Sequence, residues 1–346
     1  MIEINGAVGE GGGQVLRTSL TLSALTGVPL TIRNIRAQRS KPGLQPQHLV
    51  AVKAIAKITA AELIGASLNS PELTLIPGKV RAGRFRFEIP TAGALSLVLQ
   101  TIFLPLSLAD GASQVALTGG THVPWSPIFH YIEHHWLPVL SGCGYRTSVS
   151  LLTAGFYPQG GGTAQAKILP VKEIAPFVGL KRGQLVQIRG FSGAANLERA
   201  IPQRQKRRAL QRLYPLCADT KVKTLDLPSP GRGTFIQLTA YFSNGGRSCY
   251  TALGEKGKPA EQVADEAVDK LLTFLDTDGY VDQYLADQLL LPLLFSAGDS
   301  VFRASKVSSH LLTNANVINQ FLPRRIEVDG ALGQPGLVRV VGGLSP

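Results

Sequence analysis

The chain has 346 residues, of which 44% are hydrophobic and 17% are charged, and its formal net charge is +12. A chain this apolar is long enough for about two domains with a sizeable core, which excludes an intrinsically disordered protein. The excess of positive charge predicts an anionic partner, such as a nucleic acid, a nucleotide or an acidic membrane surface.

Neither a membrane span nor an export signal is predicted. The apolar stretch 92–109 is interrupted by Gln100 and Pro105, and the N-terminus lacks the basic and apolar regions of a signal peptide. We therefore expect a cytoplasmic protein. Its three cysteines are widely spaced without a CxxC pair, so we expect reduced thiols at Cys143, Cys217 and Cys249.

The first motif is the glycine run GEGGGQVLR at 9–17, which leads into a predicted helix at 15–26. Glycines let a ligand approach the backbone, and the free N–H groups at Gly13 and Gln14 favour an anion. Arg17, together with Arg36 and Arg39 of the following segment IRAQRSKPG, would grip phosphate oxygens as planar forks. The segment predicts a phosphate site; the alternative is an ordinary loop with surface arginines.

Helices and strands then alternate at short intervals. The expected strands lie at 30–35, 73–76, 84–89, 114–118, 145–152 and 163–169, and the expected helices at 47–64, 94–108 and 128–140. The order recurs, which predicts one unit of two helices on a small sheet, used twice. A third copy is expected at the end, with helices at 260–274, 283–293 and 310–321 and strands at 301–304, 325–328 and 337–341.

The region 183–253 breaks this order and is predicted to be an inserted domain. It contains the strand LVQIRGF, a helix at 202–213, and two strands at 235–241 and 247–252 around the turn SNGG. The helix carries the densest positive patch of the chain, formed by Arg204, Lys206, Arg207, Arg208 and Arg212. Such a patch can follow a nucleic-acid backbone, but a solvent-exposed helix face is favoured here.

Three short motifs have competing interpretations. FYPQGGG at 156–162 is either a second close-approach turn or a plain connection between strands, and GEKGKPA at 254–260 lacks the spacing of a Walker A loop. The segment HYIEH, with His130, Glu133 and His134, matches the HxxEH zinc signature. Zinc hydrolysis needs a third protein ligand, so a half-exposed helix face is favoured instead.

His310 follows Ser308 and Ser309, either of which can cap the next helix and place the imidazole in its first turn. The positive end of a helix disfavours imidazolium, and a neutral imidazole can attack phosphorus. The alternative is a histidine of the capping region that is hydrogen-bonded to the backbone. Spacing alone favours that alternative.

The chain resembles the RNA 3′-terminal phosphate cyclases in six segments that occur in the family's order: GEGGGQVLRTSL, IRAQRSKPGLQPQHL, TAGALSLVLQT, GFYPQGGG, YLADQLLLP and SSHLLTN. The resemblance covers nearly the whole chain and is weakest in the inserted region. It implies an α/β (α+β) fold with three tandem βαβαββ units and a smaller α/β domain inserted before the third. The implied division is 1–180 for the first two units, 181–276 for the inserted domain and its connection, and 277–346 for the third unit.

The resemblance implies that ATP is used to convert an RNA 3′-terminal phosphate into a 2′,3′-cyclic phosphate, with release of AMP and diphosphate. His310 would attack the α-phosphorus of ATP and become adenylylated, and AMP would then pass to the RNA phosphate, where the neighbouring 2′-hydroxyl closes the ring. The other implied catalytic residues are Arg17, Arg36, Arg39 and Gln47. The implied adenosine-binding residues are Gln100, Tyr284, Leu285, Ala286, Asp287 and Gln288. Glu10 would hold magnesium or manganese, unless it pairs with Arg17.

Two other classes remain as alternatives. A noncatalytic RNA-binding or ribosome-assembly relative would lack the nucleophilic histidine, whereas this chain keeps His310. An enolpyruvyl transferase shares the repeated unit, but the SSHLLTN segment argues against it. The sequence gives no indication of the oligomeric state.

Overall fold

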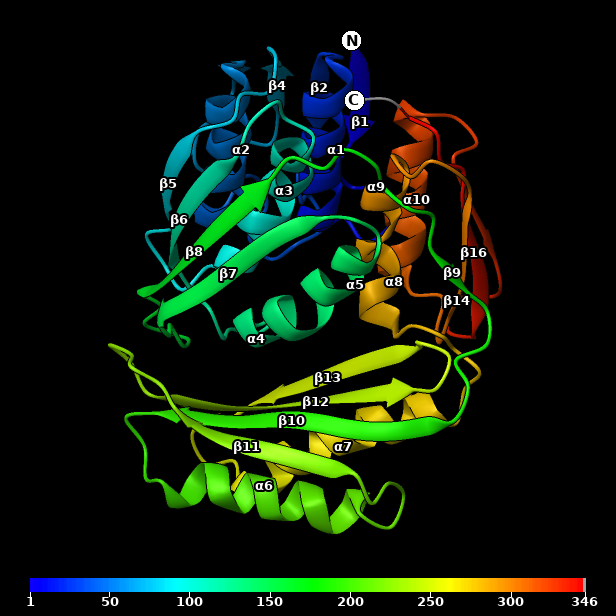
Figure 1. Cartoon of the computed structure of the whole chain (residues 1–346). Coiled ribbons are helices and arrows are strands. Elements are labelled where there is room, and N and C mark those ends of the chain that lie inside the picture. Colours follow the sequence, from blue (N-terminus) through cyan, green and yellow to red (C-terminus); the bar gives the residue numbers. More distant parts are fainter. Residues whose placement is uncertain (345–346) are drawn as a thin grey trace.

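Four sheets of four strands each make up the β structure of residues 1–344, the part of the chain that the computed structural model describes (Figure 1). Each sheet combines one parallel pair of strands with two antiparallel pairs. The α/β fold class predicted from the sequence is confirmed.

The N-terminal sheet has the strand order β1-β2-β4-β3. Its elements are β1 (Ile2–Asn5), α1 (Gly13–Thr26), β2 (Leu30–Arg33), α2 (Pro46–Thr59), β3 (Glu62–Ile64) and β4 (Leu73–Ile76). α1 ends where Gly27 adopts a left-handed conformation, as the glycine predicts. The expected helix at 47–64 was too long, because Ala60 turns left-handed and the residues after it form β3. No glycine or proline marks that end.

The second sheet has the order β5-β6-β8-β7 and repeats the pairing pattern of the first. Its elements are β5 (Arg84–Glu88), α3 (Leu95–Ser107), β6 (Ser113–Gly119), α4 (Phe129–Tyr131), the π-helix η1 (Ile132–Trp136), α5 (Leu137–Gly142), β7 (Arg146–Thr153) and β8 (Gly162–Leu169). The single helix expected at 128–140 is therefore divided by a π-helical turn. The FYPQGGG segment connects β7 to β8, and Gly160 packs against the backbone of Ala92.

The third sheet has the order β15-β16-β14-β9. Its elements are β9 (Val178–Gly179), α8 (Gln283–Gln288), α9 (Leu290–Leu293), β14 (Ser300–Ala304), α10 (Ser309–Phe321), β15 (Ile326–Asp329) and β16 (Gly336–Val340). β9 pairs with β14 although the inserted region separates them in the sequence. The chain thus leaves this part of the fold after β9, forms the inserted domain, and returns with α8 before adding the next strand, β14.

The inserted domain is the fourth sheet with two helices on one face (Figure 1). Its elements are β10 (Leu185–Ala195), α6 (Ala200–Leu213), β11 (Thr220–Asp226), β12 (Gly233–Phe242), β13 (Arg247–Leu253) and α7 (Ala260–Leu275). The sequence pattern assigned α7 to the third repeat, but α7 packs against α6, β12 and β13. Its apolar face completes a hydrophobic core separate from the main one.

The basic patch on α6 is largely neutralised by acidic residues of α7. Arg204 pairs with Glu261, Arg208 contacts Asp265, and Arg212 contacts both Asp265 and Asp269. The expected solvent-exposed face is correct for Arg204, which is exposed although paired, whereas Arg208 and Arg212 are only partly exposed. Their charges hold two helices together and leave little of the patch for an anionic partner.

Helices of the three other sheets meet in the middle of the molecule, and the sheets lie around them (Figure 1). α1 contacts α2, α3 and α10, and the buried side chains of these helices share one core. The pairing of α1 with α10 brings the beginning of the chain against its C-terminal region. All three cysteines are buried and free, as expected. Every helix in residues 1–344 is too short or too polar to traverse a bilayer.

Candidate active site

A cleft of about 2480 Å³ lies where the first residues of α1, α8 and α10 approach the inserted domain. Ten of the twelve residues predicted from the sequence line it: Glu10, Arg17, Arg36, Arg39, Gln47, Gln100, Tyr284, Asp287, Gln288 and His310. The other two, Leu285 and Ala286, are completely buried. Their side chains anchor α8 in the core, so any contact with a ligand would come from their neighbours.

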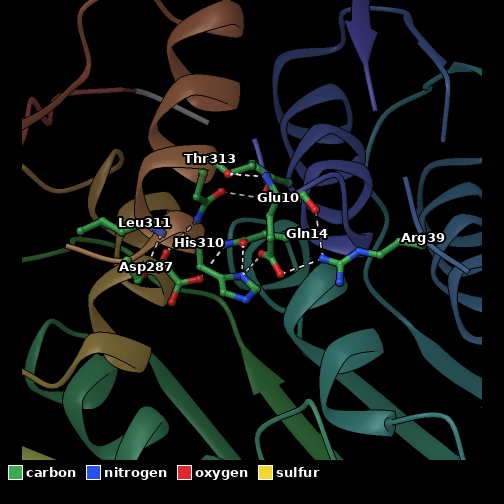
Figure 2. A network of polar contacts seen from close by, with 10 residues as sticks. Glu10, Gln14, Arg39, Asp287, His310, Leu311 and Thr313 are labelled. Carbon is green, nitrogen blue, oxygen red and sulfur yellow. Dashed lines mark hydrogen bonds and ion pairs between the residues drawn. The ribbon is translucent and has the colours of Figure 1, made fainter. Parts of the chain in front are cut away.

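His310 lies in the first turn of α10, where Ser308 accepts a hydrogen bond from the Leu311 N–H at 3.1 Å. Its Nδ1 atom is 2.6 Å from Gln14 Oε1 and 2.7 Å from Glu10 Oε2 (Figure 2). The ring is thus held by side chains of the glycine motif. The alternative of a histidine bonded to the backbone is not what the structure shows.

Gln14 fixes the tautomer of this imidazole. When Asp287 is ionised, Gln14 Nε2 donates a 2.6 Å hydrogen bond to Asp287 Oδ2, so Gln14 Oε1 faces His310 and can only accept (Figure 2). Nδ1 therefore carries the proton, and Nε2 keeps its lone pair. Burial lowers the pKa of His310; Glu10 opposes this effect, while Arg17 and Arg39 add to it. A neutral imidazole with a free Nε2 is a nucleophile.

Glu10 pairs with Arg39 rather than with Arg17. Arg39 Nη2 donates to Glu10 Oε1 at 2.9 Å and to the Glu10 carbonyl at 3.0 Å, while the Glu10 N–H donates to Thr313 Oγ1 at 3.2 Å. Glu10 Oε2 is buried and has no hydrogen bond of good geometry within residues 1–344, although His310 Nδ1 lies 2.7 Å from it. Such an unsatisfied carboxylate oxygen fits a hard divalent cation that takes its remaining ligands from phosphate and water. No three metal-ligating side chains gather anywhere in residues 1–344.

Arg17 and Asp287 are partly buried charges that line the cleft. Burial lowers the pKa of Arg17 to about 10, against the opposing effects of Asp287 and Glu10. Burial also raises the pKa of Asp287 to about 7, although the hydrogen bond from Gln14 and the charge of Arg17 act in the other direction. Arg17 remains cationic at neutral pH in a place with little water, which strengthens its attraction for an anion.

The start of α1 is shaped for close approach. Its N-cap, Gly12, offers no side chain to the first N–H groups of the helix, which stay available to an anion. A Cβ atom on Gly12 would lie 3.0 Å from Arg39 Nη2, and one on Gly13 would collide with His48 Nε2. Burial, with Arg17 and Arg36, lowers the pKa of His48 to about 3, so this ring is neutral.

Arg36 supports the loop that carries Arg39. It adopts a left-handed backbone conformation with φ of 54°, and its Nη1 donates to the carbonyls of Lys41 and Gly43. Burial, and to a lesser extent Arg39, lowers the pKa of Arg36. Arg36 thus lines the cleft while part of its guanidinium is already bound to its own loop.

The remaining predicted residues lie farther along the cleft wall. Gln47 Oε1 accepts the Ala94 N–H at 2.7 Å, which ties α2 to the start of α3. Gln100 Nε2 donates to Gln288 Oε1 at 2.8 Å. The Tyr284 ring is 42% exposed and free to stack on a flat ligand.

Sequence reasoning missed the side chains that support the site. Asn314 Nδ2 donates to the Asp287 carbonyl at 2.8 Å, and Thr18 Oγ1 donates to Asn314 Oδ1 at 2.6 Å. Thr18 and Asn314 each follow a site residue, Gln14 or His310, by one helical turn of four residues. That spacing places them on the same helix faces and is the signal that could have found them.

The HYIEH motif lies outside this constellation. His130 is buried, and its Nδ1 is 2.8 Å from His122 Nε2, whereas His134 is half-exposed and contacts Glu133 at 3.1 Å. The expected half-exposed face is therefore correct for Glu133 and His134 only. His130 Nδ1 is occupied by the contact with His122, and no group of three metal-ligating side chains forms around the motif within residues 1–344.

Comparison with known proteins identifies the family. A family model described as RNA 3′-terminal phosphate cyclase matches residues 8–328. The chain belongs to this cyclase family. Among its relatives are proteins named RNA 3′-terminal phosphate cyclase from Nostoc punctiforme, 45% identical over 96% of this chain and 97% of that protein, and from Methanopyrus kandleri, 41% identical over 98% of each.

The cyclase family membership confirms the resemblance stated from the six sequence segments. A solved structure of the enolpyruvyl transferase NikO from Streptomyces tendae aligns with 49% of this chain and 33% of its own, at 14% identity and a TM-score of 0.28. That score is too low to bear on the fold. In this cyclase, two of the matching segments, GEGGGQVLRTSL and SSHLLTN, meet at the hydrogen bond between Gln14 and His310.

Proposed function

We propose that this member of the family uses ATP to convert an RNA 3′-terminal phosphate into a 2′,3′-cyclic phosphate through a covalent adenylate on His310. The observation that carries the proposal is the 2.6 Å hydrogen bond between His310 Nδ1 and Gln14 Oε1, which leaves Nε2 free in a cleft lined by arginines. Family membership supports the reaction class, and the site geometry supports the nucleophile.

In the first step, His310 Nε2 attacks the α-phosphorus of ATP. A nitrogen–phosphorus bond forms, the bond from the α-phosphorus to the diphosphate oxygen breaks, and diphosphate leaves. The lowered pKa of His310 keeps the attacking lone pair unprotonated. The proton on Nδ1 stays bonded to Gln14, which stabilises the positive charge that develops on the ring.

The phosphates would lie between Arg17, Arg39 and the open N-terminus of α1. Two guanidinium groups and a set of unpaired N–H donors neutralise charge that increases as diphosphate leaves. Tyr284 and the hydrogen-bonded pair Gln100–Gln288 line the same cleft and would contact the adenosine. Gln47 holds the wall beside them. A magnesium or manganese ion held by Glu10 would supply further neutralisation of the phosphates.

In the second half, the adenylyl group passes from His310 to an oxygen of the RNA 3′-phosphate, forming a phosphoanhydride. The neighbouring 2′-hydroxyl then attacks the RNA phosphorus, and AMP leaves. Without this activation the ring closure would expel a poor leaving group, so the covalent route divides one high barrier into smaller ones.

The test is incubation with ATP labelled at the α-phosphate, followed by denaturing electrophoresis and by analysis of a 3′-phosphorylated RNA. We expect the wild-type chain to gain a covalent label and to produce the cyclic end. His310→Ala should abolish the label, while His134→Ala, a half-exposed histidine outside the cleft, should retain it. RNA binding by the wild type without any label would instead indicate the noncatalytic relative.

A further inference from the structure

The cleft extends beyond His310 to a mouth between the second sheet and the inserted domain. We define this junction mouth by the loops 121–127, 155–161, 228–233 and 254–259. The first two loops are joined by a bridge between His122 and Phe156. The Ala154 N–H donates to the Pro228 carbonyl at 2.7 Å, and the Gly254 N–H donates to the Thr234 carbonyl at 2.8 Å, so all four loops adjoin.

Two large aromatic side chains stand out from the junction mouth. Trp125 is 100% exposed and Tyr157 is 67% exposed, and both line the cleft that contains His310. Trp125 also has a left-handed backbone with φ of 64°, which is unfavourable for a bulky residue. A single exposed aromatic needs no explanation, but two of them on adjoining loops of one charged cleft do.

The two loops of the junction mouth that belong to the inserted domain carry unpaired positive charge. Arg232 and Lys256 are exposed, line the cleft and form no ion pair within residues 1–344. By contrast, the lining residues Arg204 and Lys258 are paired with Glu261 and Glu266. Of the cations on the four loops of the junction mouth, Arg232 and Lys256 are therefore unpaired within residues 1–344, and both lie on loops of the inserted domain.

We propose that the junction mouth binds the single-stranded segment of RNA that precedes the reacting 3′ end. Bases stack on Trp125 and Tyr157, and phosphates of the strand bind Arg232 and Lys256. This inference rests on the proposed function for the identity of the strand. Aromatic stacking accepts any base, and contacts to phosphates carry no sequence information. Because stacking on these rings needs unpaired bases, the junction mouth selects single-stranded 3′ ends of any sequence over blunt duplex ends.

Tryptophan fluorescence tests this binding without any need for catalysis. The chain has two tryptophans, and Trp136 is buried in the core. In a Trp136→Phe variant excited selectively at tryptophan, the tryptophan emission therefore comes from Trp125 alone. We expect an unlabelled single-stranded 3′-phosphorylated oligonucleotide to quench this emission, and ATP alone to leave it unchanged. Quenching by ATP alone, or no quenching by saturating oligonucleotide, would overturn the proposal.

Kinetics provide the second measurement. Trp125→Ala and Tyr157→Ala should each raise the KM for RNA by about 5- to 100-fold, while kcat and the labelling of His310 by ATP stay unchanged. Tyr214→Ala is the matched control, because Tyr214 is 51% exposed but lies outside the cleft. Arg232→Ala and Lys256→Ala should each reduce the slope of log affinity against log salt by about one.

These results separate this inference from the proposed function. Failure of the wild type to become labelled would contradict the adenylate on His310, and the fluorescence result would still decide the strand site. Normal labelling combined with an unchanged KM for RNA in both aromatic variants would reject the junction mouth alone. The labelling reaction also reports that each variant is folded.

Discussion

His310 and Gln14, which are 296 residues apart in the sequence, are joined by a 2.6 Å hydrogen bond between Nδ1 and Oε1. Gln14 is held from its other side by Asp287, so the glutamine cannot rotate without losing a second bond of 2.6 Å. The N-terminal glycine motif and the C-terminal histidine are therefore one functional unit. The role of Gln14 is to position the ring rather than to contact the reacting phosphorus.

Gln14→Ala should slow the formation of the covalent adenylate by about 10- to 100-fold, because the imidazole loses the acceptor that fixes its tautomer and orientation. The affinity for ATP should change little. Single-turnover labelling measures the rate, and a titration of rate against ATP concentration separates binding from chemistry. Gln203→Ala, an exposed glutamine on α6, is the control. An unchanged rate in Gln14→Ala would show that the tautomer is set by another group.

The pH dependence of labelling follows from the lowered pKa of His310. Its reactive form is neutral and is lost as the pH falls through the pKa of the folded protein. Because burial lowers that pKa, we expect the acidic limb of the rate profile to have its midpoint below 6.5, the value of an unperturbed histidine. Asp287, whose pKa is about 7, titrates nearby, so the profile should also be measured in Asp287→Asn. A midpoint above 6.5 in both proteins would contradict a nucleophile that is neutral because its pKa is lowered.

Much of the fold followed from local signals in the sequence. The end of α1 is set by Gly27, and the alternation in RFRFEI gives β5 its two faces. The end of α2 and the π-helix η1 could not be predicted, because both occur within residues that continue a helical pattern. Tertiary packing, rather than a local breaker, decides them.

The residues of the candidate site also fall into those that could be predicted from the sequence and those that could not. The arginines and His310 belong to recognisable segments, so their place in the cleft could be anticipated. His48 could not, since its neutral state depends on burial under Gly13 and on the charges of Arg17 and Arg36. Trp125 also gave no signal, because neither its exposure nor its neighbours across the domain junction can be read from a single stretch of chain.

Arg39→Lys tests the forked grip on phosphate. The charge is preserved, but a lysine ammonium cannot reproduce the planar contact or the two hydrogen bonds that Arg39 makes to Glu10. We expect turnover to fall by at least about 10-fold in a steady-state assay of RNA cyclisation. Arg33→Lys is the control, since Arg33 forms exposed ion pairs away from the cleft. Activity near that of the wild type in Arg39→Lys would mean that Arg39 contributes charge alone.

Asp287→Asn should stabilise the protein at neutral and alkaline pH. The pKa of Asp287 rises from 3.8 to about 7 on folding, so the ionised carboxylate disfavours the folded state. This destabilisation of the folded state is absent below about pH 4 and grows as the pH rises from about 4 to about 7. Above about pH 7 it is constant and amounts to at most about 4 kcal/mol. Urea unfolding at pH 5 and pH 8 should show a larger gain for the variant at pH 8. The exposed Asp276→Asn serves as control, and an equal gain at both pH values would refute the raised pKa.

Gly13→Ala tests whether the opening of α1 requires a glycine for reasons of space. The added Cβ would collide with His48 Nε2 and lie 2.9 Å from Arg17 Nη1, so both side chains would have to shift. We expect a loss of about 1–3 kcal/mol in the free energy of unfolding together with weaker labelling by ATP. Gly142→Ala, at the end of α5, has open space around the new Cβ and should leave both quantities unchanged. If Gly13→Ala keeps wild-type stability and labelling, the phosphate site does not depend on close approach at this position.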